Sequence, residues 1–374
     1  MDSDQRASFE PKTAQHPGET VVEYLEFHGW SQRDLARRTG LTPKTISEIC
    51  NGKAPITPPT SLALEKVFQR PAHLWLNLQR QFDEADARRR ELARSAYWKD
   101  WARKFPLKEM KRFGFSLPPG QSDVDTLLNF LGVSSPESWS SVWNATGVAY
   151  RQTRRFTTSA ESISAWVRET ELVAAQLESA EFNEKLLRSA IEKLRLLTRE
   201  RADEIMEPVQ KLCAAAGVAV VWVPEVSHIG ISGCARWLTD KKALIGLTLR
   251  HKTDDQMWYT FFHECGHLLL HRRKRSFVLD NPTEDLSDRV VDPEMQQYEA
   301  EANRFAADTL IPPHALAEFI RTKDFTSDSI HEFADAIGIG PGLVVGRLQF
   351  EGLLAPHQGN ALKQRLNWRW PEGD

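Results

Sequence analysis

Apolar residues recur at the spacing of amphipathic helices through much of the chain. Between residues 17 and 83 the pattern predicts five short helices, separated by Gly and Pro. Their apolar segments are 21–27, 35–36, 46–49, 62–68 and 74–82. The charged run at 83–94 predicts a solvated connecting helix. Residues 95–198 predict further helices with loop breaks, and no motif that carries chemistry stands out in them.

The pattern changes after residue 200. A helix over 200–217 is expected to end at Gly217, and a buried strand follows at 218–224. Residues 228–250 predict strand, turn and strand. A helix is expected from about Asp254 to 274, a second from Pro293 to Leu310, and more helix over 314–374. The predicted fold class is therefore α+β and mostly helical, with one small sheet.

Composition narrows the class of protein. Of the 374 residues, 41% are hydrophobic and 26% charged, as in ordinary soluble proteins. The net charge of -3 excludes a wholly basic nucleic-acid binder but allows one basic module. The four cysteines have no C-x-x-C spacing and are too few for a disulfide framework. The N-terminal residues lack a signal-peptide pattern, and no apolar run approaches the ~20 residues that span a bilayer. We therefore expect a cytoplasmic protein without membrane contact.

The pentapeptide His263-Glu264-Cys265-Gly266-His267 has the H-E-x-x-H spacing. Residues four apart share one helix face, so both imidazoles can bind one metal ion. Glu264 then lies beside the metal, where it can take a proton from a zinc-activated water and pass it to the leaving amine. The flanking residues are apolar, so the helix should be buried, and buried His and Glu without partners are costly. A Zn²⁺ site of a metallopeptidase explains the motif better than a plain helix.

Zinc needs a third protein ligand. His271 continues the four-residue spacing of His263 and His267, but it lies two turns from His263. One straight helix therefore does not bring all three histidines to one ion. The predicted helix at 293–310 offers Glu299, Glu301 and Asp308. Glu301 adjoins the expected packing face of that helix and is the preferred candidate, with Glu299 as the alternative. Any of these acids could instead be a solvated helix residue. The expected packing face consists of Ala302, Phe305, Ala306 and Leu310.

The segments HECGHLLLH and EAEANRFAADTLIP resemble the ImmA/IrrE family of metallopeptidases. That family pairs H-E-x-G-H on one helix with E-A-N-x-F-A on a later one, and the match covers about 200–350. The resemblance implies zinc ligation by His263, His267 and Glu301, with Glu264 as the base. It also implies a protein substrate, commonly a helix-turn-helix repressor. The predicted strand at 243–250 could offer an edge to which the substrate adds, or be purely structural.

The segment SQRDLARRTGLTPKTISEICNGKAPIT predicts two short helices joined at 39–41, as in a helix-turn-helix. Ser31 can cap the first helix and Thr42 the second, with Pro43 in its first turn. The first helix then begins at a DNA phosphate, and the second enters the major groove. The candidate DNA-binding residues are Gln32, Arg33, Lys44, Thr45, Ser47, Asn51 and Lys53.

Residues 17–83 as a whole resemble the Xre-type domain of HigA-like antitoxins. This resemblance implies binding to a double-stranded DNA operator, autoregulation and a homodimer, and makes a toxin a candidate partner. A helical domain kept only for protein contact is the alternative.

Together these patterns predict five parts: a tail (1–15), a five-helix DNA-binding domain (16–85), a helical linker (86–199), a zincin-like domain (200–315) and a helical extension (316–374). The preferred function is a DNA-binding regulatory zinc metallopeptidase. The first alternative is a non-proteolytic repressor or antitoxin whose zinc domain senses or binds a partner. The second is self-cleavage that releases the DNA-binding domain. The intact Glu264 favours the peptidase, because a structural zinc site does not need that carboxylate.

Overall fold

The computed structural model describes residues 15–147, 159–201, 204–249, 252–271, 276–279 and 293–366, and only the backbone of 144–147 and 276–279. The chain divides into two compact units, Met1–Trp98 and Lys99–Asp374, which are described separately. Apart from Gln15, the predicted tail lies outside the described residues. The finer division into five parts stays a prediction. Among the described residues, none of the helices has the length and hydropathy needed to cross a membrane.

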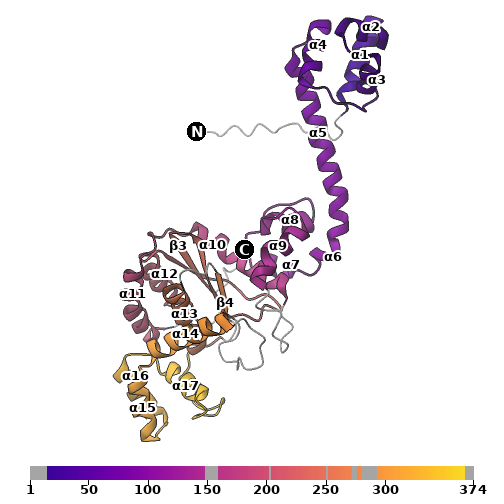
Figure 1. The fold of residues 1–374 in the computed structure, drawn as a ribbon. Helices are drawn as coiled ribbons and strands as arrows, with labels where there is room; N and C mark the ends of the chain where they lie inside the picture. The colour runs from indigo at the N-terminus through magenta and orange to yellow at the C-terminus, as the bar shows by residue number, and fades with distance from the viewer. Residues whose placement is uncertain are drawn as a thin grey trace. The chain divides into compact units, whose positions relative to one another are not determined.

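The N-terminal unit contains the five predicted helices (Figure 1). They are α1 (Pro17–His28), α2 (Gln32–Thr39), α3 (Pro43–Cys50), α4 (Pro58–Phe68) and α5 (Ala72–Ser95), followed by η1 (Ala96–Trp98). The Ser31 hydroxyl accepts from the Asp34 N–H at 3.2 Å, and the Thr42 hydroxyl accepts from the Thr45 N–H at 3.1 Å, so both predicted caps are present. The charged run at 83–94 does not form a helix of its own but continues α5.

The second unit begins with helices. They are α6 (Lys99–Ala102), α7 (Leu107–Arg112), α8 (Asp123–Leu131), α9 (Pro136–Gly147), α10 (Ala160–Gln176), α11 (Glu184–Leu196), η2 (Leu197–Arg199) and α12 (Met206–Ala214). The predicted helix over 200–217 is therefore shorter, and Gly217 follows it with a φ of +82° that favours glycine.

A sheet and two long helices form the centre of this unit. The strands are β1 (Val218–Trp222), β2 (Gly233–Thr239), β3 (Lys242–Leu247) and β4 (Ser276–Leu279). The helices are α13 (Asp254–Leu270) and α14 (Pro293–Leu310). The chain continues through α15 (Pro313–Thr322), α16 (Ser327–Ile337), α17 (Pro341–Phe350) and η4 (Asn360–Leu362). The helix expected to reach residue 274 ends at Leu270, and residues 272–274 lie outside the described part of the chain.

The strand order is β1-β3-β2-β4. β3 pairs in parallel with β1 and antiparallel with β2, and β4 pairs antiparallel with the other side of β2. Both sides of β3 are thus occupied by strands. The expectation that residues 243–250 offer an exposed edge is therefore wrong for the strand itself, and Arg250 lies outside the described residues. β4, which the sequence pattern did not predict, stands next to β2 at one end of this order.

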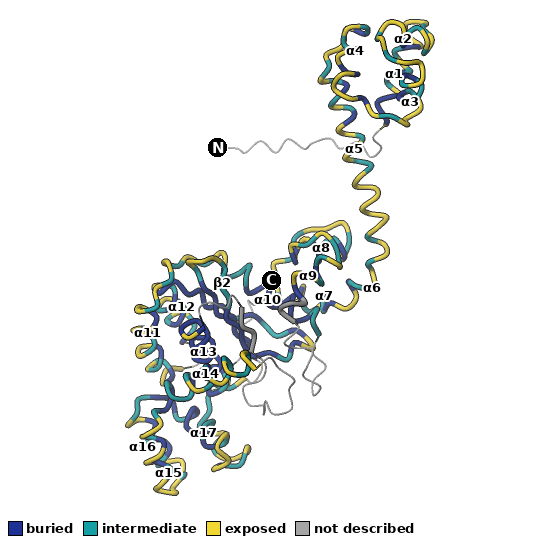
Figure 2. The backbone as a smooth tube through the Cα atoms, in the orientation of Figure 1, coloured by how far each residue is buried: buried dark blue, intermediate teal, exposed yellow. Residues whose placement is uncertain are grey.

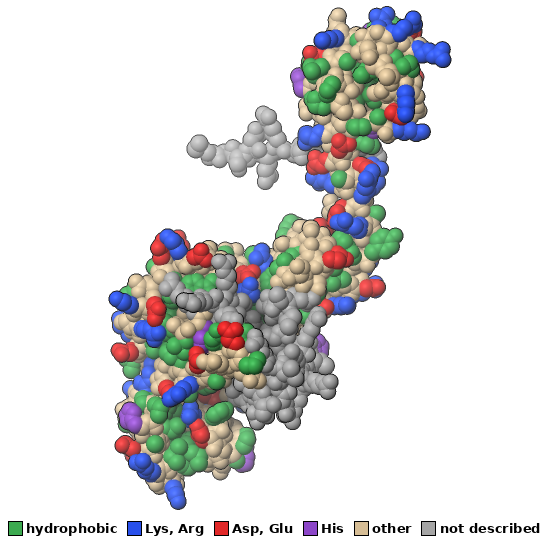
Figure 3. Space-filling view, viewed as in Figure 1, with side chains coloured by type: hydrophobic (Ala, Val, Ile, Leu, Met, Phe, Trp, Pro, Cys, Tyr) green, Lys and Arg blue, Asp and Glu red, His purple; other side chains and the backbone are tan. Residues whose placement is uncertain are grey.

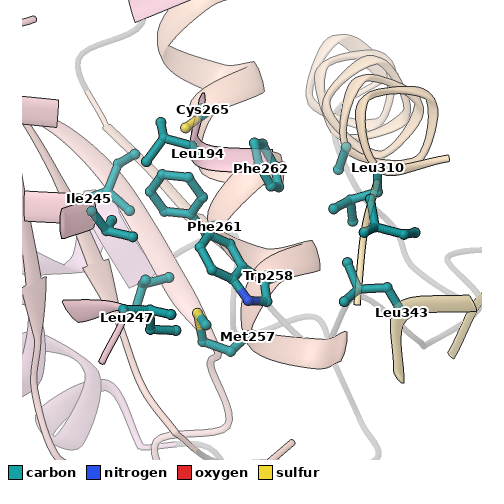
Figure 4. Close-up of a cluster of buried hydrophobic side chains, with 14 of the residues drawn as sticks. Leu194, Ile245, Leu247, Met257, Trp258, Phe261, Phe262, Cys265, Leu310 and Leu343 are labelled. Carbon is teal, nitrogen blue, oxygen red and sulfur yellow. The ribbon is translucent and has the colours of Figure 1, made fainter. Parts of the chain in front are cut away.

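The sheet lies between α10 and α13. Thr170 of α10 approaches Cys234 of β2, with 3.9 Å between Oγ1 and Sγ, and Trp166 of α10 donates its indole N–H to the Val223 carbonyl at 3.1 Å. Gly233 directly precedes Cys234 in β2 and faces α13, because successive residues of a strand point to opposite faces of the sheet. α13 brings aromatic side chains to a buried cluster with Ile245 and Leu247 (Figure 4). α13 is buried along most of its length (Figure 2).

Candidate functional site

The candidate site lies where α13 packs against α14. Three polar residues of α13, His263, Glu264 and His267, have exposed fractions of 0%, 0% and 1%. The two helices approach closely at Gly266, where an added Cβ would lie 3.2 Å from the Cα of Ala302. This close approach brings polar side chains of α14 within hydrogen-bond distance of the histidines.

Three ligand atoms converge there. The Nε2 atoms of His263 and His267 lie 2.8 Å apart. The Glu299 carboxylate lies 3.2 Å from Nε2 of His263 and 3.4 Å from Nε2 of His267. Within the described residues, these three side chains form a group whose ligand atoms all lie within 4.8 Å of one another.

The structure places Glu299, the alternative candidate, beside the two imidazoles, and not Glu301. Glu299 precedes the buried residues Ala302 and Ala306 by three and seven positions, so it shares their helix face. Glu301 lies about 100° around the helix from Ala302. Phe305, a member of the expected packing face, is half-buried and packs against the hydrophobic core.

The other acids and His271 have different neighbours. The Glu301 carboxylate lies 2.8 Å from Nε2 of His271 and accepts from Gln297 at 2.7 Å. Hydrogen bonds, first from His271 and then from Gln297, hold the pKa of Glu301 below its usual range. Asp308 pairs with Arg304 one turn away. The Nδ1 atom of His271 lies 3.2 Å from Nδ1 of His267, on the side of that ring away from Glu299.

Two residues to which the sequence interpretation gave no role, Tyr259 and the Asn303 of the E-A-N-x-F-A motif, complete the site. The side-chain oxygen of Asn303 lies 2.9 Å from Nδ1 of His263 and accepts from the Tyr259 hydroxyl at 3.0 Å. Since an amide oxygen only accepts, Nδ1 of His263 carries a proton, and in the neutral ring Nε2 then carries the lone pair. The sequence signal was the four-residue spacing of Glu299 and Asn303, which places both side chains on the side of α14 nearest His263.

Glu264 has an unusual environment. Neither of its carboxylate oxygens has a hydrogen-bond partner within the described part of the chain. A Cβ added to Gly233 of β2 would lie 3.1 Å from one of these oxygens. Burial, and then the charge of Glu299, raise the pKa of Glu264 well above its usual range.

The donor set fits zinc. Burial lowers the pKa of His267 to about 4, so the imidazole is neutral near pH 7. Two neutral imidazoles and one carboxylate are the ligands of the His₂Glu catalytic zinc sites, which keep a fourth position open. Without a proton or a cation between them, the converging acceptor atoms would repel one another.

The predicted DNA-binding residues lie on α2, α3 and the turn after α3. Arg33, Lys44, Asn51 and Lys53 are exposed, and Gln32, Thr45 and Ser47 are half-buried. Lys44 lies 3.8 Å from Glu48 one turn along α3, and Asn51 donates to the Ser47 carbonyl at 2.7 Å. Lys and Arg side chains stand out around α2 (Figure 3).

Comparisons with known proteins cover both units. Residues 23–75 match the family model described as helix-turn-helix, and residues 241–349 match the peptidase model described as IrrE N-terminal-like domain. The chain is 36% identical over 78 residues to the uncharacterized HTH-type transcriptional regulator YddM of Escherichia coli (strain K12), a match covering 20% of this chain and 83% of that protein. It is 39% identical over 69 residues to virulence-associated protein I of Dichelobacter nodosus. This match covers 18% of this chain and 64% of that protein, which is less than two thirds of its length.

Two solved structures are similar to part of the chain. One is a putative antidote protein of a plasmid maintenance system from Nostoc punctiforme, with 29% identity and a TM-score of 0.22, covering 22% of this chain and 91% of that one. The other is an addiction module antidote protein of a HigA family from Coxiella burnetii, with 29% identity and a TM-score of 0.21. This match covers 28% of this chain and 97% of that one. By its sequence matches, the chain belongs to the helix-turn-helix regulators through its N-terminal unit, and it carries a peptidase-family domain of the IrrE N-terminal-like type.

Proposed function

We propose that this chain is a DNA-binding regulatory zinc metallopeptidase that cleaves a protein substrate. The observation that carries the proposal is Glu264, a fully buried carboxylate without a hydrogen-bond partner in the described residues. It stands on the helix that presents two converging imidazoles. A buried carboxylate without partners is costly, and a site that only held a metal would not need it.

His263, His267 and Glu299 would hold the zinc ion, which supplies the Lewis acidity that polarises a peptide carbonyl and acidifies water. Asn303 orients His263 through Nδ1, so that its Nε2 lone pair points toward Glu299 and His267. Glu264 takes a proton from the attacking water and gives it to the nitrogen of the broken peptide bond. Burial raises the pKa of Glu264, which strengthens it as a proton acceptor, and the positive charge of a bound zinc ion would keep the carboxylate ionised before it accepts the proton.

The N-terminal unit would bring this centre to DNA. We propose that Gln32, Arg33, Lys44, Thr45, Ser47, Asn51 and Lys53 contact an operator, with the chain bound as a homodimer. The substrate would then be a regulator found at the same DNA, such as a helix-turn-helix repressor, and a toxin is a further candidate partner. The exposed basic and polar side chains of α2 and α3 support this proposal.

The test measures zinc content and cleavage of purified helix-turn-helix repressors by the full-length protein. Wild type should hold one zinc and cleave. Glu264→Gln should hold zinc but lose about 10²-fold or more of the cleavage rate, because only the proton acceptor is removed. His263→Ala and Glu299→Ala should lose zinc. The exposed residues His314 and Glu318 of α15 supply the matched controls, His314→Ala and Glu318→Gln.

Two outcomes would contradict the proposal in different ways. A wild-type protein that binds no zinc under zinc-replete conditions would overturn the metal site. Zinc bound by wild type, with equal activity of wild type and Glu264→Gln on every repressor, would overturn the role of Glu264 and favour a domain that senses or binds a partner.

A further inference from the structure

A line of three side chains runs from the candidate metal site to the surface. Nδ1 of His267 lies 3.2 Å from Nδ1 of His271. Nε2 of His271 lies 2.8 Å from the Glu301 carboxylate. The His271 side chain is 2% exposed and its ring packs against Tyr298, with centroids 4.4 Å apart, whereas the Glu301 side chain is 43% exposed. The line therefore ends in a solvated carboxylate.

The carboxylate fixes the direction of every hydrogen bond in the line. An ionised Glu301 can only accept, so Nε2 of His271 carries a proton. In the neutral form of His271, the proton on Nε2 is the only N–H of the ring, and Nδ1 is an acceptor. The facing Nδ1 of His267 must then donate. This places the lone pair of His267 on Nε2, the atom that lies 2.8 Å from Nε2 of His263 and 3.4 Å from Glu299.

The other histidine reaches the same state by a shorter route. Nδ1 of His263 donates directly to the side-chain oxygen of Asn303. Both rings thus have Nδ1 oriented by an acceptor and Nε2 turned toward the same point. A hydrogen bond of this kind from a ligand histidine sets its tautomer and raises its basicity.

We propose that His271 and Glu301 are positioning residues that hold His267 as the Nδ1–H tautomer and so present its Nε2 lone pair to the metal. Neither residue binds the metal. The proposal rests on the proposed function for the identity of the metal as zinc, but the tautomer of His267 can be measured without any metal. Glu301 thereby has a role other than the ligand role that the sequence resemblance implied.

The first experiment determines the His267 tautomer in full-length, metal-free protein near pH 8. Long-range ¹H–¹⁵N correlation spectra of histidine-labelled protein distinguish the two tautomers, and the His267 signals are assigned by their loss in His267→Gln. Wild type should show the Nδ1–H form. His271→Phe, which keeps a ring against Tyr298 but removes the acceptor, should shift His267 toward the Nε2–H form.

The second experiment measures zinc affinity by competition with a chelator. His271→Phe and Glu301→Ala should each weaken binding by about 10- to 100-fold while one zinc still binds at saturation, because the ligands remain. Glu301→Gln, whose amide oxygen can still accept, should recover part of the loss. The matched controls, His331→Phe and Glu332→Ala, change exposed residues of α16 and should bind like wild type.

The outcomes separate this proposal from the proposed function. An Nε2–H tautomer in wild type, or zinc affinity within about twofold of wild type in both His271→Phe and Glu301→Ala, would overturn the positioning role. If His271→Phe does not fold, the exposed Glu301→Ala decides. A wild-type protein that binds no zinc would overturn the zinc peptidase, while the tautomer of His267 in wild type and Glu301→Ala would still decide whether the line sets it.

Discussion

At the scale of single residues, His16 shows how one side chain can make a helix depend on pH. Its Nδ1 accepts from the Gly18 N–H at 2.9 Å and caps α1, and its ring meets Phe82 edge to face at 4.8 Å. Burial lowers the pKa of His16, against the opposing charges of Asp83 and Glu19. A protonated imidazole has no acceptor, so protonation removes the cap.

We expect His16→Leu to make α1 open more readily at pH 7.5, by about 1 kcal/mol, the usual value of a helix cap. The pKa of His16 is lower in the folded state than in the unfolded chain, so the contribution is present above about pH 6.5 and is lost as the pH falls. The difference between wild type and His16→Leu in the free energy of opening α1 should therefore be smaller at pH 5.5. Hydrogen–deuterium exchange of the α1 amides in the full-length protein, corrected for intrinsic rates, measures this free energy. A difference of the same size at both pH values would contradict this account.

Some residues of the candidate site could be predicted from the sequence pattern, and others could not. The H-E-x-x-H spacing was enough to predict that His263 and His267 face one point, because both residues lie on one helix. The partner on α14 depends on how two helices pack. The expected packing face of α14 does pack, but both Glu299, one turn before Ala302, and Glu301, next to Ala302, adjoin it. The sequence pattern alone could not decide which of the two acids reaches the histidines. The contact between Asn303 and His263 depends on the same packing of α14 against α13.

At the scale of elements, Gly266 controls the distance between α13 and α14. A Cβ at this position would lie 3.2 Å from the Cα of Ala302 and 3.2 Å from the Phe305 ring. Both are tight contacts, and the first is with backbone, so α14 would have to move as a unit. Because Glu299 and Asn303 lie on α14, such a movement would change their distances to the histidines.

We expect Gly266→Ala to weaken zinc binding by about tenfold, although it changes none of the residues that we propose to hold the ion. It should lower the free energy of unfolding by about 2 kcal/mol or less, because about 1 kcal/mol of helix propensity offsets part of the overpacking strain of about 1–3 kcal/mol. Cys265→Ala is the matched control. That side chain is fully buried in the hydrophobic cluster, so this variant should lower stability and keep zinc affinity. Chelator competition measures the zinc affinity of both variants, and thermal unfolding measures their stability. A Gly266→Ala protein with wild-type zinc affinity would refute the prediction.

Helices were easier to predict than the sheet for a physical reason. The bounds Pro293–Leu310 of α14 agree with the prediction, because a helix is defined by contacts within its own segment. The place of β3 between β1 and β2, and the addition of β4 to β2, depend on pairing between distant segments. α10 likewise comes from the region interpreted as a linker, yet it covers one face of the sheet.

At the scale of the whole molecule, the net charge of -3 does not show how the charges are distributed, and Lys and Arg side chains stand out around α2 (Figure 3). Some of these cations already have partners within the N-terminal unit: Arg37 pairs with Asp34, and Arg38 lies 3.9 Å above the Trp30 ring. Arg33 and Lys53 are exposed. Arg33 is the second residue of α2, and the N-terminus of this helix is also where a phosphate would be favoured by the helix dipole.

We therefore expect Arg33→Ala in the full-length protein to weaken binding to double-stranded DNA by a similar factor on every sequence, because a phosphate contact carries no base information. The slope of log affinity against log salt should fall in magnitude by about 1, the value for one lost phosphate contact. Arg321→Ala makes the same change in net charge on α15 of the second unit and is the matched control. If both variants reduce the slope equally, the effect belongs to overall charge, and α2 does not contact the phosphate. If only Arg33→Ala reduces it, the contact is local, and the N-terminal unit binds DNA through α2.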